Sequence, residues 1–196
     1  MMKRIFAATA VAVLIVFGAY AQSVVSTFKD RRDGKTYRTV KIDKMVWMAE
    51  NLNYDAKGSK CYDNKAENCA RYRRLYDWAT ALKACPAGFH LPADDEWAAL
   101  ENSVGGSITA SKKLKSAAGW NKNGGGTDEY GFSALPGGYG ASDGVFRDAG
   151  DGGFWWSATD DTAGGAWSRY MRVGNVWVDK YANVKTLMFS VRCVAD

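Results

Sequence analysis

Residues 85–97, CPAGFHLPADDEW, contain in order a cysteine, a Pro-Gly turn, a histidine, a Leu-Pro step and three acidic residues. Pro86 and Gly88 predict the end of a helix, because proline cannot continue a helix and glycine readily closes one. The three acids predict the start of another helix, whose N-terminal partial positive charge favours carboxylates. The stretch therefore indicates a joint between two helices, with Cys85 and His90 at the junction.

Apolar residues on both sides of this joint recur at helical spacing. Before the joint, residues 72–84 are predicted to form a helix. Its apolar stripe, which ends at the joint, consists of Leu75, Trp78, Ala79, Leu82 and Cys85. After it, Trp97, Leu100 and Val104 share one face of a second helix. A shorter helix is expected over residues 109–118, with three lysines on its outer side, Lys112, Lys113 and Lys115.

Strand patterns lie toward both ends of the chain. Residues 36–42 and 45–48 flank an Asp43-Lys44 turn and predict an N-terminal β-hairpin. From Gly119 the chain is rich in glycine, asparagine and aspartate, which is typical of long loops, with one short strand around residues 131–135. Further strands are expected at residues 154–159, 167–173, 176–179 and 189–194. This order predicts one α+β domain with a closing antiparallel sheet.

The first 21 residues have the pattern of a secretory signal peptide. Lys3 and Arg4 precede an apolar run, and Ala19-Tyr20-Ala21 forms an A-x-A cleavage site. The run is shorter than the ~20 residues that span a bilayer, and no later stretch is long and apolar enough to do so. We therefore expect residues 1–21 to be removed on export and residues 22–196 to form a single domain that is periplasmic, at the cell surface or secreted.

The charge is too mild to indicate nucleic-acid binding. The formal net charge is +5 at pH 7, or about +3 once the signal peptide is removed. The densest basic stretch, residues 29–44, alternates with Thr, Tyr, Val and Ile. That alternation favours the solvated face of a hairpin over a phosphate-binding groove.

The four cysteines, Cys61, Cys69, Cys85 and Cys193, all lie after the predicted cleavage site. An even number in an exported protein indicates disulfides. A zinc site is disfavoured because no C-x-x-C pair is present. Three pairings are possible on paper; the polar loop between Cys61 and Cys69 could close on itself, which would leave Cys85 to reach Cys193.

His90 is the only histidine of the chain, and its acidic neighbours suggest either a catalytic centre or a structural joint. The helix start already explains the carboxylates, and no nucleophile lies near His90 in the sequence. We therefore favour the structural interpretation and expect no enzymatic activity, although glycosidase chemistry needs only two suitably spaced carboxylates.

Of the 8 tryptophans, four lie between Trp155 and Trp177. Trp155 and Trp156 are adjacent in a predicted strand, so their side chains point to opposite faces and cannot enter the same core. The favoured interpretation is that the second one packs under the loops; the alternative is an exposed aromatic surface on which sugar rings stack. The candidate ligand-binding residues are Trp156, Trp167, Tyr170, Trp177 and Tyr139, with Arg169 and Arg172 as polar neighbours.

No cofactor is required by these patterns, but the acidic loops raise calcium as a possible ligand. Carboxylate oxygens are suitable Ca²⁺ ligands, although Asp-Gly clusters serve turns equally well and no EF-hand spacing is present. The candidate metal ligands are Asp143, Asp148, Asp151, Asp160 and Asp161.

Several segments, in order, resemble the Fibrobacter succinogenes major paralogous domain from about Thr27 to the C-terminus. They are DGKTYRTVKIDKMVWMAENLNYDA, CARYRRLYDWATALKACPAGFHLPADDEWAALE, LKSAAGW, DEYGFSALPGGYG, WWSAT and SVRCVAD. A helix cysteine, Gly, His-Leu and then Glu96-Trp97 are also similar to the opening of C-type lectin-like domains. That resemblance implies a lectin-like architecture and a bridge from Cys85 to Cys193.

The segments GFHLPADDEW and SVRCVAD also resemble those of formylglycine-generating enzymes, which share that architecture. The reactive cysteine pair of those enzymes is absent, as are the sugar- and calcium-binding motifs of lectins. We therefore expect an exported, non-catalytic module that binds carbohydrate or another envelope ligand, with a polysaccharide or an envelope protein as partner. The first alternative is a structural or protein-interaction component of the cell envelope. A formylglycine-type or glycan-active enzyme is a less favoured alternative.

Overall fold

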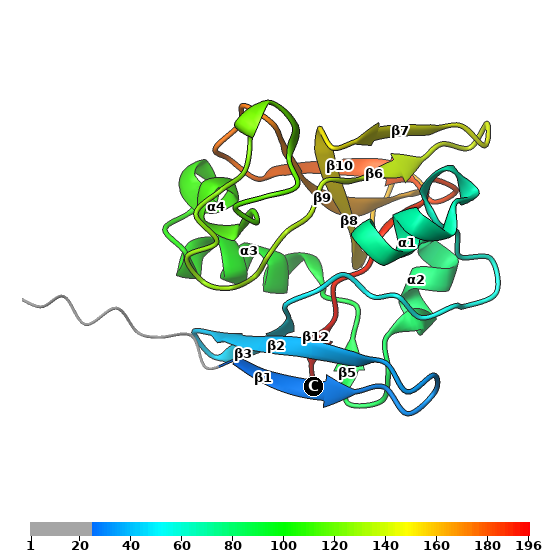
Figure 1. Cartoon of the computed structure of the whole chain (residues 1–196), viewed down its shortest axis with the longest axis horizontal. Coiled ribbons are helices and arrows are strands. Elements are labelled where there is room, and N and C mark those ends of the chain that lie inside the picture. Colours follow the sequence, from blue (N-terminus) through cyan, green and yellow to red (C-terminus); the bar gives the residue numbers. More distant parts are fainter. Residues whose placement is uncertain (1–24) are drawn as a thin grey trace, which may run out of the picture.

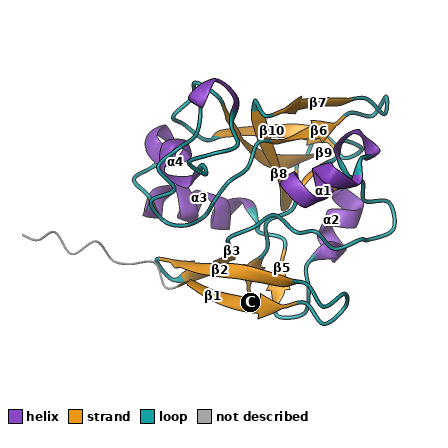
Figure 2. Ribbon diagram, viewed as in Figure 1, coloured by secondary structure: helices purple, strands orange, loops and turns teal. Residues whose placement is uncertain are grey.

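The computed structural model describes residues 25–196, so the predicted signal peptide lies outside the described residues. The described chain is an α+β fold built from two sheets and four α-helices (Figures 1 and 2). Figure 1 shows the sheet containing β1–β3 at the bottom of the molecule, with α3 and α4 above it at the left and α1 and α2 above it at the right. Among the described residues, no helix has the length and hydropathy needed to cross a membrane.

The first sheet has five strands in the order β1-β2-β3-β12-β5, and all its neighbouring strands are antiparallel. The predicted N-terminal hairpin forms its centre. An additional strand, β1, covers the outer edge of that hairpin. The bounds are β1 Val25–Lys29, β2 Thr36–Ile42, β3 Met45–Met48, β5 Phe89–His90 and β12 Val194–Ala195.

The second sheet is built around the antiparallel strands β8, β9 and β10, in the order β10-β9-β8-β11-β4. It is mixed, because β11 and β6 each pair with β8 in parallel, and β7 extends it beyond β6. The bounds are β4 Leu75–Tyr76, β6 Gly137–Gly140, β7 Phe146–Ala149, β8 Gly152–Asp160, β9 Gly165–Arg172, β10 Asp179–Val184 and β11 Phe189–Ser190.

Two of the predicted strands are wrong. Residues 131–135 contribute only one isolated bridge, between Ala134 and Lys115. The strand predicted at residues 176–179 is displaced, because Val178 N–H donates to Ser107 O rather than to a neighbouring strand. The strand begins instead at Asp179 and continues to Val184.

The helices are α1 Ala66–Tyr72, α2 Trp78–Ala84, α3 Asp94–Ser103 and α4 Ser107–Leu114, with 3-10 turns at Tyr62–Asn64 and Asn121–Asn123. The helix predicted over residues 72–84 is only partly correct. Leu75 pairs in β4 with β11, so the helix starts later, where Asp77 Oδ1 accepts a hydrogen bond from Thr80 N at 2.8 Å. Leu82 is 42% exposed, so it does not belong to the buried stripe. Side-chain capping at Asp77 outweighs the periodicity that the sequence shows.

The second predicted helix is confirmed as α3, whose Trp97 and Leu100 are fully buried together with Val104 just beyond its end. The third is confirmed as α4, but it ends at Leu114. Lys115 was expected on the outer side of this helix, and that expectation is wrong. Its side chain turns inward after the helix ends, and the residue is only 3% exposed.

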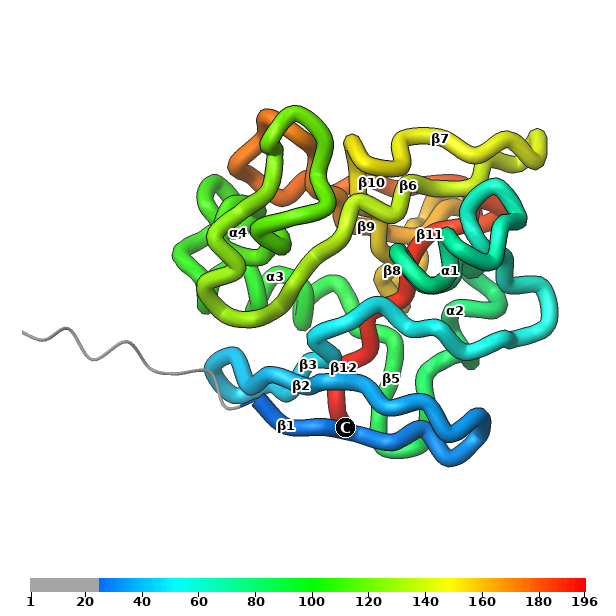
Figure 3. Tube along the Cα trace, viewed as in Figure 1, coloured from blue at the N-terminus to red at the C-terminus, as the bar shows by residue number. Residues whose placement is uncertain are grey.

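The C-terminal segment joins the two sheets. Figure 3 shows it running from β11 in the larger sheet to β12 in the five-stranded sheet. Between these strands, Met48 N donates to Cys193 O at 2.9 Å and Leu52 N donates to Val191 O at 2.8 Å. The predicted strand at residues 189–194 is therefore split between two sheets, which makes this segment central to the fold.

Both predicted disulfides are present. Cys61 bonds to Cys69 across 8 residues, and Cys85 bonds to Cys193 across 108 residues. None of the four cysteines is free. The long bridge ties the joint after α2 to the C-terminal segment, and disulfides of this kind fit an oxidising, non-cytoplasmic compartment.

Two hydrophobic cores lie on opposite faces of β8, and the two adjacent tryptophans divide between them. Trp155 packs in one core with Trp47, Trp97 and residues of α3 and α4. Trp156 packs in the other with Phe189 and residues of α2. The expectation that the two side chains do not enter the same core is confirmed, and both are fully buried.

A buried polar network lies next to Trp155. Asn51 Oδ1 accepts hydrogen bonds from Trp155 Nε1 at 2.8 Å and from Arg192 Nη2 at 2.7 Å. The Arg192 guanidinium also donates to the backbone carbonyls of Met48, Phe132 and Ser133. Complete burial lowers the pKa of Arg192 to about 9. This arginine ties the C-terminal segment to two loops through hydrogen bonds.

Candidate functional site

One face of strands β8, β9 and β10 is covered only in part. Phe154 and Trp156 of β8 lie on this face, and their cross-strand partners on β9 are Tyr170 and Ser168. Helix α2 covers the end near Trp156, where Trp78 Nε1 donates to Ser157 O at 2.9 Å. The end around Tyr170 has no such cover and faces a pocket.

This pocket has a volume of about 290 Å³, and we call it the tyrosine pocket. That volume is near the lower limit for small-molecule sites, about 300 Å³. The lining comes from β6, β8, β9, β10, β11 and the loops beside them: Tyr139, Ala141, Phe154, Tyr170, Arg172, Tyr181, Ala182, Asn183, Leu187 and Phe189.

Aromatic rings form most of the apolar part of the lining. Phe154 and Phe189 are buried and lie 5.5 Å apart between ring centroids, in a stacked arrangement. The ring centroid of Tyr139 lies 4.9 Å from that of Phe154, and the Tyr170 centroid lies 5.2 Å from Phe154 on β8. Tyr181 stacks on Tyr170 at 4.9 Å. The pocket therefore extends from the buried core to an exposed tyrosine.

Two polar side chains contribute hydrogen-bonding capacity. The guanidinium carbon of Arg172 lies 5.2 Å from the Tyr170 ring centroid. Its nearest carboxylate is that of Asp148, at 3.6 Å, and the side chain of Arg172 is 48% exposed. Asn183 Nδ2 donates to Ser168 Oγ at 2.8 Å. An exposed arginine held beside aromatic rings can donate several hydrogen bonds to a ligand oxygen.

Tyr170 is the tyrosine most affected by its surroundings. Burial raises its pKa above the ordinary value, and the neighbouring Tyr181 hydroxyl raises it further. The Tyr170 hydroxyl is therefore protonated at neutral pH and available to donate or accept a hydrogen bond.

Three of the seven predicted ligand-binding residues meet in this pocket: Tyr139, Tyr170 and Arg172. Trp156 does not, and its prediction as part of an exposed surface is wrong. It is fully buried, and its Nε1 donates to Tyr76 O at 2.8 Å. The reason is that α2 covers the part of the sheet face on which it lies.

Arg169 was also expected at an exposed surface, and that expectation is wrong. It lies on the opposite face of β9 and is 2% exposed. Its guanidinium forms 2.7 Å ion pairs with Glu101 and Asp94 of α3. Burial raises the pKa of Glu101, and the contact with Arg169 opposes that effect. Arg169 therefore fixes α3 to the sheet.

The two remaining tryptophan candidates lie outside the pocket lining. Trp167 is on the Arg169 face of β9, and Lys180 Nζ lies 4.1 Å from its ring centroid. Trp177 is 44% exposed in the connection between β9 and β10. Neither contributes to the tyrosine pocket.

The tyrosine pocket also contains residues that the sequence patterns did not single out. The most informative are Tyr181 and Asn183, which project from β10 on the same face. The alternation of Tyr181 and Asn183 with Lys180 and Ala182 indicates a strand with one distinct face. That signal was missed because the predicted strand ended at Asp179.

The five candidate metal ligands do not lie in one group, and they make separate contacts with different parts of the chain. Asp143 pairs with Arg147 at 2.8 Å, which lowers the pKa of this carboxyl to about 2. Asp160 pairs with Lys185 at 2.8 Å. Asp148 lies near Arg172, Asp151 N donates to Asp148 O, and the Asp161 backbone bonds to Gly165. Within residues 25–196, no three His, Cys, Asp or Glu side chains are grouped closely enough to hold a metal ion.

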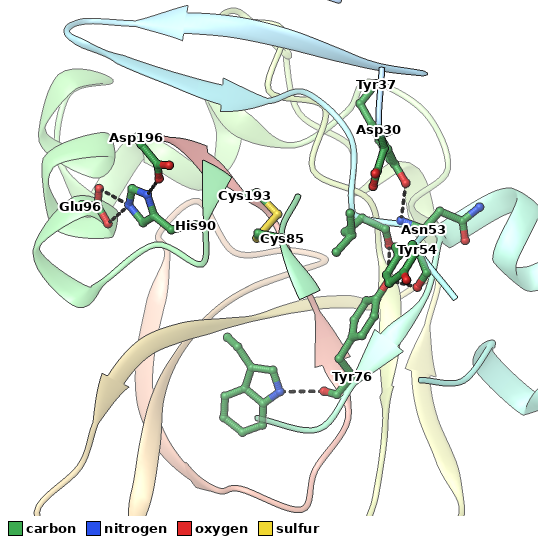
Figure 4. The surroundings of a disulfide bond; sticks show 12 residues. Asp30, Tyr37, Asn53, Tyr54, Tyr76, Cys85, His90, Glu96, Cys193 and Asp196 are labelled. Atoms are coloured by element: carbon green, nitrogen blue, oxygen red, sulfur yellow. Dashed lines mark hydrogen bonds and ion pairs between the residues drawn. A yellow bond between two sulfur atoms is a disulfide. The ribbon is translucent and has the colours of Figure 1, made fainter. Parts of the chain in front are cut away.

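His90 lies in β5 of the five-stranded sheet and does not line this pocket. Figure 4 shows it beside the long disulfide. Its Nδ1 is 2.7 Å from Asp196 Oδ1, and its Nε2 is 2.9 Å from Glu96 Oε1. Glu96 also accepts a hydrogen bond from Ala93 N at the start of α3. With both ring nitrogens occupied, His90 connects the C-terminal residue to α3. This geometry agrees with the structural interpretation.

Comparison with known proteins gives one match. The family model described as the Fibrobacter succinogenes major domain matches residues 40–195, which is most of the chain. No curated protein and no solved structure matches. The C-type lectin-like architecture therefore stays a prediction.

Proposed function

The chain belongs to the Fibrobacter succinogenes major domain family, and we propose that it is an exported, non-catalytic module that binds carbohydrate in the tyrosine pocket. The observation that carries this proposal is the combination of three tyrosines with Arg172 and Asn183 around one cavity of about 290 Å³. Sugars present apolar C–H faces and polar hydroxyl edges. Aromatic rings suit the faces, and amide or guanidinium groups suit the hydroxyls.

The position of Tyr181 supports a binding role. It is 51% exposed although it is a large aromatic residue on a regular strand. Its ring is held against Tyr170, so a ligand would not need to order a freely rotating side chain. Preorganised aromatic groups increase affinity because less conformational entropy is lost on binding.

The lining of the pocket supports binding rather than catalysis. Within the described part of the chain, the ten residues that line the pocket include no carboxylate, histidine, serine or cysteine. Glycoside hydrolysis usually requires a pair of carboxylates on either side of the bond. The four cysteines are also consumed by disulfides, which leaves no thiol for formylglycine-type chemistry.

Export is supported by the disulfides and by the predicted signal peptide. Both features suit a protein that meets polysaccharide outside the cytoplasm.

The proposal is tested by retention of the oxidised protein, residues 22–196, on a panel of insoluble plant polysaccharides. Tyr181→Ala is the informative variant, because the residue is exposed and its removal should not disturb the cores. Trp177→Ala is the matched control, since it removes a similarly exposed aromatic residue outside the pocket. We expect retention on at least one polymer, loss with Tyr181→Ala and no loss with Trp177→Ala.

Two outcomes would change the proposal. Equal loss with both variants would indicate nonspecific aromatic adsorption. No retention on any polymer would favour the protein-interaction or structural role in the envelope. A parallel set with EDTA tests calcium, because loss of retention in EDTA would support a requirement for a divalent cation, although the five candidate aspartates form no single cluster among the described residues.

A further inference from the structure

A second cavity, of about 240 Å³, lies beside the C-terminal end of α4. It shares no lining residue with the tyrosine pocket. Three segments surround it: the end of α4, the glycine run after the 3-10 turn at Asn121–Asn123, and the turn between β9 and β10. The lining residues are Lys112, Lys115, Asn123, Gly124, Gly125, Gly174, Asn175 and Val176. None of them is acidic.

Lys115 is the central residue of this cavity. It is 3% exposed, and its Nζ donates at 3.1 Å to the carbonyl oxygens of Arg172 and Asn175. An ammonium group has three donors, so these carbonyls leave one without a strong acceptor. The Trp120 ring centroid, 4.9 Å from Nζ, provides only a cation–π contact.

No carboxylate compensates this buried charge. Neither Lys115 nor Lys112 takes part in an ion pair with any residue of the described chain. Burial lowers the pKa of Lys115 accordingly. A buried ammonium without an anionic partner is costly, so an anion in the cavity would be favoured.

The glycine run holds a backbone segment close to the lysines. A Cβ on Gly125 would lie 2.5 Å from Ala117 O, and one on Gly124 would lie 2.7 Å from Val173 Cγ1. Side chains are thus excluded on packing grounds. Gly124 N and Gly126 N donate to Asn121 O and Ser116 O, whereas Gly125 N has no hydrogen-bond partner among the described residues. Glycine backbones with available N–H groups commonly contact oxyanions.

We propose that this cavity binds a small oxyanion, held by the ammonium groups of Lys112 and Lys115 and the backbone N–H of Gly125. The chemical class is a tetrahedral phosphate or sulfate group or a carboxylate. The cavity is smaller than the ~300 Å³ typical of drug-sized ligands, so it suits one anionic group rather than an extended molecule. The site is independent of the tyrosine pocket.

The test is an NMR titration of the ¹⁵N-labelled oxidised protein with sodium sulfate, sodium phosphate and sodium glucuronate, each at constant ionic strength against sodium chloride. We expect saturable shifts of the Gly124, Gly125 and Gly174 amides with at least one of these anions. Saturable shifts with sulfate or phosphate alone would identify the ligand of this cavity as a tetrahedral oxyanion. Saturable shifts with glucuronate would identify it as a carboxylate.

Lys112→Gln is the main variant, because Lys112 is exposed and its removal should leave the fold intact. It should weaken binding roughly two- to fivefold, as expected for one exposed charge. Lys113→Gln is the matched control on the same helix, since Lys113 does not line the cavity. Lys115→Met should abolish binding, and the wild-type spectrum of the remaining amides would show whether this variant folds.

The proposal is overturned if no anion gives a saturable shift at these glycines. It is equally overturned if Lys113→Gln weakens binding as much as Lys112→Gln does, because the shifts would then report only general surface charge.

Discussion

The rings of Tyr170 and Tyr181 stack across β9 and β10 with their centroids 4.9 Å apart and their planes 18° from parallel. Tyr170 also packs on buried Phe154, whereas Tyr181 is 51% exposed. The pair therefore continues the aromatic core of the larger sheet to the molecular surface. This continuity gives the tyrosine pocket a rigid aromatic wall.

The influence of the Tyr181 hydroxyl on Tyr170 can be tested through ionisation of Tyr170. Because burial and Tyr181 both raise the pKa of Tyr170, it should ionise well above the ordinary tyrosine value of 10.0. Tyr181→Phe keeps the stacked ring and removes the hydroxyl, so the pKa of Tyr170 should fall part of the way back. NMR of ¹³C-labelled tyrosine rings during an alkaline titration measures this. Ionisation of Tyr170 at the ordinary value would contradict the burial of its hydroxyl.

The same shift has a consequence for stability. The unfolded chain loses the tyrosine proton at a lower pH than the folded chain does. The contribution of Tyr170 is therefore complete below about pH 10 and is lost as the pH rises toward the folded-state pKa. Denaturant titrations across this range should show a smaller alkaline loss of stability in Tyr170→Phe than in the wild type.

Arg192 is expected to be essential for stability. Arg192→Met would remove this donor from Asn51 Oδ1 and from the carbonyls of Met48 and Phe132, which are buried, and from the partly buried carbonyl of Ser133. We expect a loss of about 3 kcal/mol or more in the free energy of unfolding. Arg192→Lys should recover only part of it, because an ammonium cannot reproduce the planar donor arrangement. Urea denaturation measures both, and wild-type stability in Arg192→Met would show that the network is dispensable.

The two disulfides should contribute unequally to stability. In the loop-entropy model the Cys61–Cys69 bridge contributes about 2.6 kcal/mol and the Cys85–Cys193 bridge about 4.8 kcal/mol. The long bridge also holds the C-terminal segment that joins both sheets. Replacing each pair by serine and measuring urea denaturation should show the larger loss for Cys85 and Cys193. An equal or larger loss for the short bridge would refute this ranking.

His90 should titrate above the ordinary histidine pKa of 6.5. Burial acts to lower the pKa, but the hydrogen bonds that the His90 ring donates to the carboxylates of Asp196 and Glu96 outweigh it and raise the pKa overall. The stabilisation is present below about pH 6.5 and is lost as the pH rises through the folded-state pKa. As His90 is the only histidine, one NMR resonance follows it without ambiguity. Asp196→Asn should lower the His90 pKa, and an unchanged value would mean that this contact does not form in solution.

Much of the fold could be predicted from local patterns. The Asp43-Lys44 turn between two segments of strand-like alternation predicted the hairpin, and the acidic residues after Pro92 predicted the start of α3. The cysteine spacing and the resemblance to lectin-like domains gave both disulfides. These features depend on residues near one another in the chain or on covalent chemistry, so the sequence reports them directly.

The errors arise where distant segments decide the outcome. Leu75 fits a helical stripe, but it pairs with β11, which lies more than a hundred residues later. Lys115 has the sequence context of a surface lysine, but its ammonium group is held inward by the carbonyls of Arg172, at the end of β9, and Asn175, in the β9–β10 turn. Trp156 and Arg169 are buried for the same kind of reason, by α2 and α3 respectively. Such contacts have no signature in the residues beside them.

The candidates named from the sequence include three residues that line the tyrosine pocket. Tyr139, Tyr170 and Arg172 were candidates because aromatic residues are dense in this region. Phe154 and Phe189 could not be assigned to it, because only the pairing of β6, β8 and β11 brings them beside Tyr139. A correct strand boundary at Asp179 would have added Tyr181 and Asn183.

The most direct test of the carbohydrate-binding proposal is calorimetric titration of residues 22–196 with an oligosaccharide of whichever polymer retains the protein. We predict saturable binding that weakens roughly tenfold in Tyr181→Ala, as the loss of one aromatic stacking contact implies, and is unchanged in Trp177→Ala. Circular dichroism of both variants should match the wild type. Wild-type affinity in a correctly folded Tyr181→Ala would contradict the assignment of the tyrosine pocket as the ligand site.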